Sequence, residues 1–281
     1  MVNCLKMQAA TTASNLLGIT VWVAAGVNIL SLIFLIGYIL AQGISYLNWE
    51  LFAFEYTTQN VSLFPALVNT VLIIVIALSL AAPLGICTAI YFVDYAKKGN
   101  KLVSVMDITT DTLAGIPSVV YGLFGLLFFV SYLQFGYSLL AGACTVAIMI
   151  LPVIIRTTEE ALQAVPTSYR EGSYALGADK LRTVFVVVLP AAVPGILAGI
   201  ILSIGRIMGE TAVLIYTAGT VAQLPEELFS SGRSLAVHLY VLASEGLFME
   251  QAFATAVVLV IITVIINGAS TWIAGKLMRG N

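Results

Sequence analysis

Charged residues are scarce in this chain of 281 residues, and their scarcity excludes an ordinary soluble domain. Asp, Glu, Lys and Arg make up 9% of the residues, whereas hydrophobic residues make up 60%. The formal net charge of −2 says little about partners, because the charges are sorted by location along the chain; we expect no nucleic-acid partner. Long apolar runs instead predict an integral membrane protein that contacts lipid.

Residues suited to metal binding or catalysis are also few. Cys4, Cys87 and Cys144 have no metal-ligand spacing, and each is interpreted as a small core residue, so we expect neither a disulfide nor a metal site. The chain contains no G-x-x-x-x-G-K-[ST] stretch, and therefore no phosphate-binding loop for ATP. We expect no catalytic residue, no cofactor bound by this chain and no enzymatic activity of its own. Any transport must draw its energy from a partner or from an ion gradient.

Six apolar runs are long enough to cross a bilayer, which requires about 20 residues per helix. They must be helical, because backbone groups in lipid have to be hydrogen-bonded within the segment. The first run is too long for a cleaved signal sequence and is predicted to stay as a span. We divide the chain into residues 1–66, a span and an external connection, and residues 67–281, the core. The predicted spans are 16–41, 67–93, 111–133, 137–155, 190–216 and 253–274.

Basic residues fix the predicted orientation. With the exception of Arg206 and Arg233, they lie near the termini or in the connections 94–110 and 156–183. The positive-inside rule then places both termini and these two connections in the cytoplasm. The segment 217–252 lies outside under this assignment. Its sequence SLAVHLYVLASEG predicts a short external amphipathic helix, in which His238 is a surface or packing residue.

Two apolar segments are less regular. Residues 184–224 are too long for one helix, so we start the fifth span near Pro190, a residue suited to a first helical turn. The residues before Pro190 would then form an approach helix along the inner membrane interface. In the third span, glycine and proline in AGIPSVVYGLFG predict a bend and tight packing.

The connection 156–183 contains signals for a short, separate helix. Pro166 disfavours continued helix in the residue before it, so the preceding helix should end there. Ser168 and Glu171 have the spacing of a capping box, Gly177 can supply a left-handed stop, and Asp179 can cap the next helix. These signals predict a helix over about 169–176. The alternative is an ordinary polar loop with an incidental cap.

The same connection resembles a motif of a known transporter family. Glu171-Gly172-Ser173, Gly177 and then Val187-x-Leu189-Pro190 are similar to the EAA loop of ABC importer permeases, with two alanines and an isoleucine replaced conservatively. In that family the loop forms a coupling helix that docks on the ATP-binding subunit. The resemblance implies this role for residues 168–178. The implied coupling residues are Ser168, Tyr169, Arg170, Glu171, Gly172, Ser173, Leu176 and Gly177.

Further stretches resemble the phosphate importers within that family. LAGIPSVVYGLFGLLFF, EEALQAVPTSYREGSYALGA and ILSIGRIMGETAVL carry this similarity over about 110–215. The resemblance implies an all-α integral membrane fold with six transmembrane helices, of the type I (MetI-like) importer class. It implies a prokaryotic inner-membrane location and several partners. These are a second homologous permease in a heterodimer, two ATP-binding subunits that hold ATP and Mg, and an extracytoplasmic phosphate-binding protein.

Two charged residues lie within the predicted fifth span. A basic side chain at the centre of a span costs about 2.5–3.5 kcal/mol, so Arg206 should face a polar path or a partner. Glu210 follows four residues later, on the same face of an uninterrupted helix. The pair either lines the translocation path, with Thr211 as a further donor, or forms an internal ion pair that locks two helices. The small residues Gly195, Gly199 and Ser203 continue this face and should allow another helix, such as one of the partner permease, to approach closely.

Other functions remain open on the sequence alone. The permease could carry another oxyanion, such as molybdate, tungstate or sulfate. A different class, an ion-driven secondary transporter with Arg206 and Glu210 as its relay, would be supported by inverted repeats. No convincing repeat is visible. A receptor or scaffold fits the intramembrane charges less well.

Overall fold

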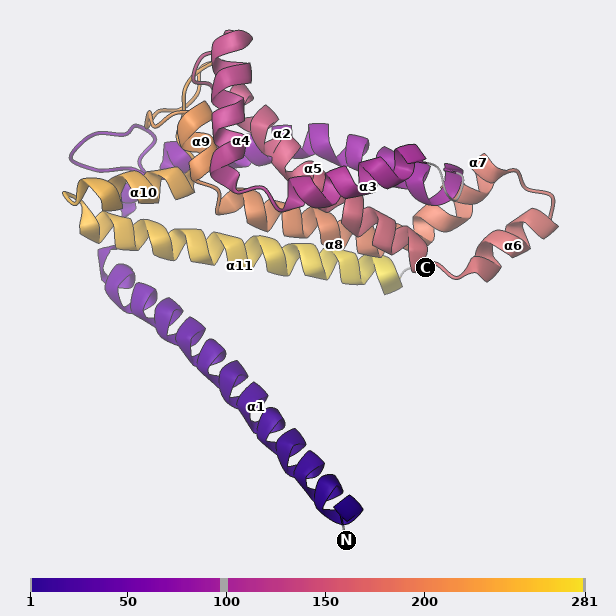
Figure 1. Ribbon diagram of the computed structural model, residues 1–281. Coiled ribbons are helices and arrows are strands. Elements are labelled where there is room, and N and C mark those ends of the chain that lie inside the picture. The colour runs from indigo at the N-terminus through magenta and orange to yellow at the C-terminus, as the bar shows by residue number, and fades with distance from the viewer. Residues whose placement is uncertain (1, 97–100, 280–281) are drawn as a thin grey trace.

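The computed structural model describes residues 2–96 and 101–279, and these residues are helical apart from their connections. Figure 1 shows α2, α5, α8 and α11 running roughly along one direction. Within the described residues, five helices are long and apolar enough to cross a membrane, and a bent pair can supply a sixth crossing. The first five α-helices are α1 (Val2–Gly43), α2 (Phe64–Ile90), α3 (Lys101–Ala114), α4 (Ser118–Gly125) and α5 (Leu139–Gln163). The later helices are α6 (Thr167–Ala175), α7 (Lys180–Arg182), α8 (Leu189–Met208), α9 (Ala212–Thr217), α10 (Leu235–Glu245) and α11 (Met249–Arg279).

Short 3-10 and π-helical segments connect or extend several of these helices. The π segments matter most, because each continues a helix with a wider turn that shifts the direction of its side chains. The 3-10 segments are η1 (Ile44–Tyr46) and η2 (Trp49–Phe52), and the π segments are η3 (Tyr91–Tyr95), η4 (Leu126–Tyr132) and η5 (Thr183–Val188).

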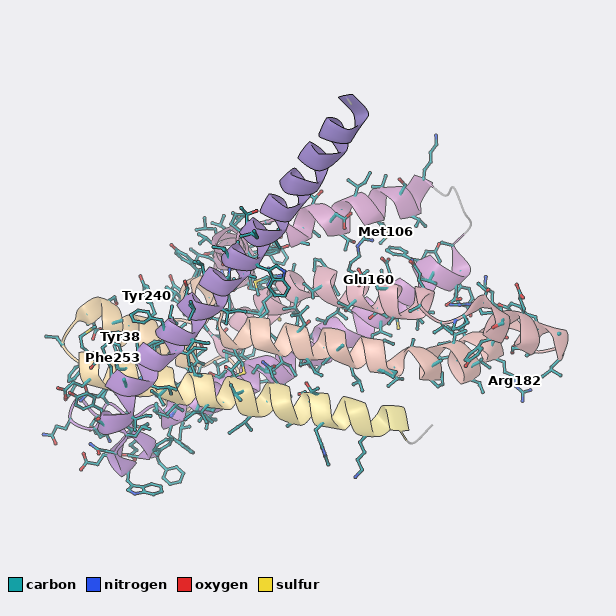
Figure 2. All side chains as sticks on the ribbon, turned by 90° about the horizontal axis from the view of Figure 1, so that it is seen from below. Tyr38, Met106, Glu160, Arg182, Tyr240 and Phe253 are labelled. Atoms are coloured by element: carbon teal, nitrogen blue, oxygen red, sulfur yellow. The ribbon has the colours of Figure 1, made fainter. Side chains whose placement is uncertain are left out.

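The first helix, α1, stands apart from the rest of the chain. Figure 1 shows it leaving the other helices at an angle, with the N-terminus far from the body. Its contacts are made near its C-terminal end with α11, where the Tyr38 ring meets the Phe253 ring edge-on at 6.0 Å (Figure 2). From residue 18 on, nearly all of its apolar side chains are exposed in the single chain. This helix therefore needs lipid or another protein to cover it.

Helix α5 lies at the centre of the body and contacts α2 and α8. Glycines permit both approaches: a Cβ added at Gly85 of α2 would lie 2.7 Å from Ile154 of α5, and one at Gly195 of α8 would lie 2.6 Å from Ala161. Gly199 faces Thr157 of α5 even more closely. The small-residue stripe therefore does allow close packing, but its partner is α5 of the same chain.

The third span is bent more sharply than the sequence indicates. Helices α3 and α4 meet at 101° across the break at residues 115–117, where glycine and proline interrupt the helix. The hydroxyl of Tyr121 donates to the carbonyl of Leu113 at 2.7 Å and so satisfies an acceptor at the break. The predicted bend is confirmed. The helix before it begins at Lys101, so part of the predicted connection 94–110 is helical as well.

The predicted limits of the fifth span are wrong. Residues Lys180–Met208 form one continuous 29-residue helix, so Pro190 does not begin the span and no separate approach helix precedes it. The wide π turn η5 directly precedes α8, and Pro190 lies in the first turn of α8, where its missing N–H and its ring are tolerated. The helix also ends at Met208 rather than near residue 216. A separate short helix, α9, follows.

Filling the small-residue stripe should destabilise the fold. We expect Gly199→Val to lower the free energy of unfolding by about 1–3 kcal/mol, because the new side chain overlaps Thr157. Gly268→Val in α11 is the matched control, since a Cβ there meets open space. Thermal unfolding of the detergent-solubilised protein measures the difference. Equal shifts in the two variants would contradict the packing of α8 on α5.

Candidate functional site: the α6 helix and the half-buried Arg206

The short helix predicted in the connection 156–183 exists as α6, within one or two residues of its predicted limits. The preceding helix α5 ends at Gln163, before Pro166, as predicted. Gly177 adopts a positive φ of 82° after the helix, and the Asp179 side chain accepts a hydrogen bond from the Arg182 amide at 2.9 Å. The left-handed stop and the cap of the next helix are both confirmed.

The predicted capping box is wrong. Helix α6 begins at Thr167 with Pro166 as its N-cap, and no side chain caps it. Ser168 thus lies inside the first turn, two positions beyond the cap, and cannot reach the free amides as a cap does. Glu171 makes no hydrogen bond within the described residues, and its side chain is exposed.

The side chains of α6 divide between two faces. Arg170 and Ser173, three residues apart, are half-buried and turn towards the body of the protein, where the Ser173 hydroxyl lies 2.9 Å from that of Thr183. The other face is open, and Leu176 just after the helix is 91% exposed. Figure 1 shows α6 at the end of the molecule far from α10. The exposed positions of α6 and the two residues after it are Thr167, Ser168, Tyr169, Glu171, Gly172, Tyr174, Ala175, Leu176 and Gly177.

Arg206 and Glu210 do not share a helical face. Arg206 lies in the last turn of α8, whereas Glu210 follows the end of the helix and accepts a hydrogen bond from the Val213 amide at 3.2 Å. Glu210, one position before the N-cap Thr211, therefore satisfies a free amide in the first turn of α9, a role that sequence reasoning missed. In the part of the chain that the structure describes, Arg206 forms no ion pair with Glu210. The internal ion pair expected as one alternative is absent from this arrangement.

Arg206 lies near two helix breaks, one between α3 and α4 and one between α8 and α9. Its guanidinium interacts electrostatically with the hydroxyl of Tyr121, the residue that bridges the α3–α4 break. The α8–α9 break lies at residues 209–211 and includes Thr211, whose carbonyl accepts from the Ile215 amide at 3.0 Å. Backbone at interrupted helices is tolerated within membrane proteins where it is buried in protein or lines a water-filled cavity. Arg206 is half-buried there and has no carboxylate partner within the described part of the chain.

Two glycines of α4 allow this helix to pack closely against α9. A Cβ at Gly122 would lie 3.0–3.2 Å from atoms of Ala212, Val213 and Tyr216. One at Gly125 would lie 2.6 Å from a methyl carbon of Thr217. The two segments that follow the helix breaks therefore pack closely on each other. Their packing fixes the position of the breaks beside Arg206.

A second buried basic residue, Arg233, lies near α10. It is 4% exposed, and its guanidinium carbon is 4.8 Å from the centre of the Tyr56 ring. Among the residues that the structure describes, its Nε and Nη2 atoms have no hydrogen-bond partner. The Asn69 side chain of α2 donates to the carbonyl of Arg233 at 3.2 Å. His238 is buried beside this group, so the packing interpretation of the histidine is confirmed. No local sequence pattern predicts this cluster, because its members come from three separate segments.

Cysteine packing is only partly as predicted. Cys144 of α5 is half-buried, but Cys87 lies on an exposed face of α2, and the side chain of Cys4 lies outside those described. Within the described residues, no group of three His, Cys, Asp or Glu side chains could hold a metal ion.

The long apolar helices, one of them bent at a break, define an all-helical protein that crosses the membrane several times. Solved structures share this fold. The chain has a TM-score of 0.60 to the MetNI methionine ABC transporter in an inward-facing conformation, at 21% identity over 76% of this chain and 94% of that one. A bacterial ABC transporter for alginate import gives 0.62 at 14% identity, over 91% and 96%.

Sequence comparison identifies the family. Residues 81–279 match the binding-protein-dependent transport system inner membrane component, and the chain belongs to this family of ABC importer permeases. A probable ABC transporter permease of Bacillus subtilis, YqgI, is 32% identical over 88% of this chain and 90% of its own length. The phosphate transport system permease protein PstA 1 of Mycobacterium tuberculosis is 36% identical over 74% and 69%. The PstA protein of Yersinia pestis is 41% identical over 54% and 51%.

Acid should destabilise the cluster around His238 specifically. Burial, followed by the nearby Arg233 charge, lowers the pKa of His238 to about 3, while the Val61 carbonyl opposes the shift. Between about pH 6.5 and 3, His238 is protonated in the unfolded chain but stays neutral in the folded chain. The free energy of unfolding therefore falls as pH drops through this window. Each unit of pH within it lowers stability by up to about 1.4 kcal/mol.

The measurement is the melting temperature at pH 7 and pH 5. Because the chain has a single histidine, His238→Gln removes all histidine titration. The wild type should lose more stability than the variant on acidification. An equal loss in both proteins would contradict a buried, neutral His238.

Proposed function

We propose that the chain is one of the two permease subunits of an ATP-driven importer of inorganic phosphate. Membership of the permease family establishes the class, and the PstA-type relatives support phosphate as the substrate. The structural observation that carries the proposal is Arg206, which is half-buried beside two helix breaks and forms no ion pair with any residue that the structure describes, because a guanidinium suits a phosphate oxyanion. Another oxyanion is the alternative substrate. Family membership leaves no support for an ion-driven secondary transporter.

In this proposal α6 is the coupling helix that receives movement from a separate ATP-binding subunit. The chain would supply half of the translocation path, and a second homologous permease would supply the other half and contribute to covering α1. An external binding protein would deliver phosphate. The complex would hold two ATP-binding subunits, with ATP and Mg bound there, while this chain performs no hydrolysis.

The proposed topology places α6 and both termini on the cytoplasmic side of the inner membrane. The basic residues of the two connections on that side support this orientation. The α10 segment, at the other end of the molecule in Figure 1, would then face the binding protein. Closure of the ATP-binding subunits would displace α6, and the permeases would change between inward and outward openings as rigid bodies.

The exposed face of α6 can be tested by charge reversal. Glu171→Lys should reduce the amount of ATP-binding subunit that copurifies with the permease by about tenfold, equivalent to about 1.4 kcal/mol, because the reversed charge lies in the proposed contact. The matched control is Glu160→Lys, an exposed carboxylate of α5 outside α6 (Figure 2). Unchanged copurification and uptake in Glu171→Lys would contradict the docking role.

The path residue can be tested by removing its charge. Arg206→Gln should lower phosphate uptake into proteoliposomes at least about tenfold while the ATP-binding subunit still copurifies, because the electrostatic attraction for the anion is lost. Arg206→Lys keeps the charge without the planar fork and should give an intermediate rate. Normal uptake by Arg206→Gln would show that the residue is structural.

A further inference from the structure

Helix α6 is attached to the body of the protein mainly through polar contacts. None of its residues is fully buried, so little apolar packing holds it in place. Where the chain enters α6, a hollow of about 300 Å³ separates it from α8. The hollow is lined by Ala161, Ala164, Val165, Pro166, Tyr169, Ala191, Ala192 and Gly195. The attachment therefore depends on the two side chains that face inward, Arg170 and Ser173.

Arg170 joins three separate elements through one guanidinium group. Its Nε donates to the Oδ1 atom of Asp94 at 3.1 Å, its Nη1 donates to the carbonyl of Val165 at 3.1 Å, and its Nη2 donates to the carbonyl of Leu162 at 3.0 Å. Leu162 belongs to the last turn of α5, where free carbonyls carry partial negative charge. A planar guanidinium can hold these three acceptors in a fixed geometry, which a lysine cannot.

Asp94 provides the connection to α2. It lies in the π segment η3, which continues α2 without interruption as part of the helix Phe64–Tyr95. Its side chain is only 5% exposed, and that of Arg170 is 17% exposed. The second carboxylate oxygen, Oδ2, is buried and has no hydrogen-bond partner among the described residues, which leave out 97–100. Within the described residues, Arg170 is therefore the cation that balances the charge of Asp94.

The two elements joined by Arg170 also pack against each other. Helix α2 meets α5 at Gly85, where an added Cβ would lie 2.7 Å from Ile154. Below this contact, Ala89 and Ile90 of α2 share a buried apolar cluster with Leu162 and Val165. A displacement applied at Arg170 therefore acts on a rigid pair of helices rather than on a loose loop. Ser173, bonded to Thr183 of η5, gives a second connection to the long helix that contains α8.

We propose that the Asp94–Arg170 ion pair is the contact that transmits movement of α6 into the α2–α5 pair. This inference rests on the proposed function of α6 as the coupling helix. Arg170 and Asp94 are positioning residues, since they face inward and leave the exposed face of α6 free for the ATP-binding subunit. Docking and force transmission are then separable properties of the same short helix. Glu171 serves the first, and Arg170 with Asp94 serves the second.

The test measures the number of phosphate ions transported per ATP hydrolysed. The complete complex, with its ATP-binding subunits and binding protein, is reconstituted into proteoliposomes with Asp94→Asn, with Arg170→Gln or with both. Copurification of the ATP-binding subunit and its ATP hydrolysis should stay within about twofold of wild type, while the transport-to-hydrolysis ratio falls roughly tenfold. The double variant should be no worse than the worse single variant, because both changes break one interaction.

Matched controls distinguish the loss of the Asp94–Arg170 ion pair from the loss of any nearby charge and from misfolding. Arg182→Gln and Glu160→Gln remove exposed charges near the same end of the molecule, and both should keep the wild-type ratio (Figure 2). Asp94→Glu preserves the carboxylate and should restore most of the ratio. Asp94→Asn is the milder of the two single variants, because Arg170→Gln leaves the buried carboxylate of Asp94 without its cation.

Two results would overturn the inference. One is an unchanged ratio in both single variants. The other is a parallel loss of transport, hydrolysis and assembled complex in Asp94→Asn, which would show that the pair only stabilises the fold. Failure of the proposed function has a different signature, because the wild-type permease would then recruit no ATP-binding subunit or transport no phosphate.

Discussion

The close packing of α5 against α2 and α8 is the constraint on which the rest of the structure depends. Gly85, Gly195 and Gly199 remove the side chains that would keep these helices apart, and hydrophobic side chains fill the remaining interface. Apolar burial offers little driving force between helices in lipid, so close contact and van der Waals packing must supply the attraction. The resulting three-helix body gives the breaks near Arg206 and the attachment of α6 a common rigid support.

Function is divided between two regions of this body. At one, interrupted helices place Arg206 beside Tyr121 and the start of α9. At the other, α6 presents an exposed face while Arg170 ties it to Asp94 and to the end of α5. Helices α5 and α8 extend from one region to the other. A movement that begins at α6 can therefore change the geometry around Arg206 without a flexible link between them.

Sequence reasoning predicted the features that depend on local chemistry. Span composition, the turn at Pro166, the left-handed Gly177 and the cap at Asp179 are set by residues close together in the chain, and the structure confirms them. It failed where the local pattern does not determine the course of the helix or the partner of a side chain. The continuous helix through Pro190 depends on a π turn that the sequence pattern does not reveal, and the break at residues 209–211 separates Arg206 from Glu210 despite helical spacing. Asp94 was overlooked, because it lies 76 residues from Arg170 and no local motif connects them.

The most direct measurement of the central claim is site-specific crosslinking from the loop that follows α6. A photoreactive residue at Leu176, which is 91% exposed, should crosslink to the ATP-binding subunit in native membranes. The same residue at Trp49, which is 92% exposed near the α10 end of the molecule, should not crosslink to it. A crosslink from Leu176 that disappears when the ATP-binding subunit is absent is the predicted result. Labelling of Leu176 from the outside of intact cells would contradict the account.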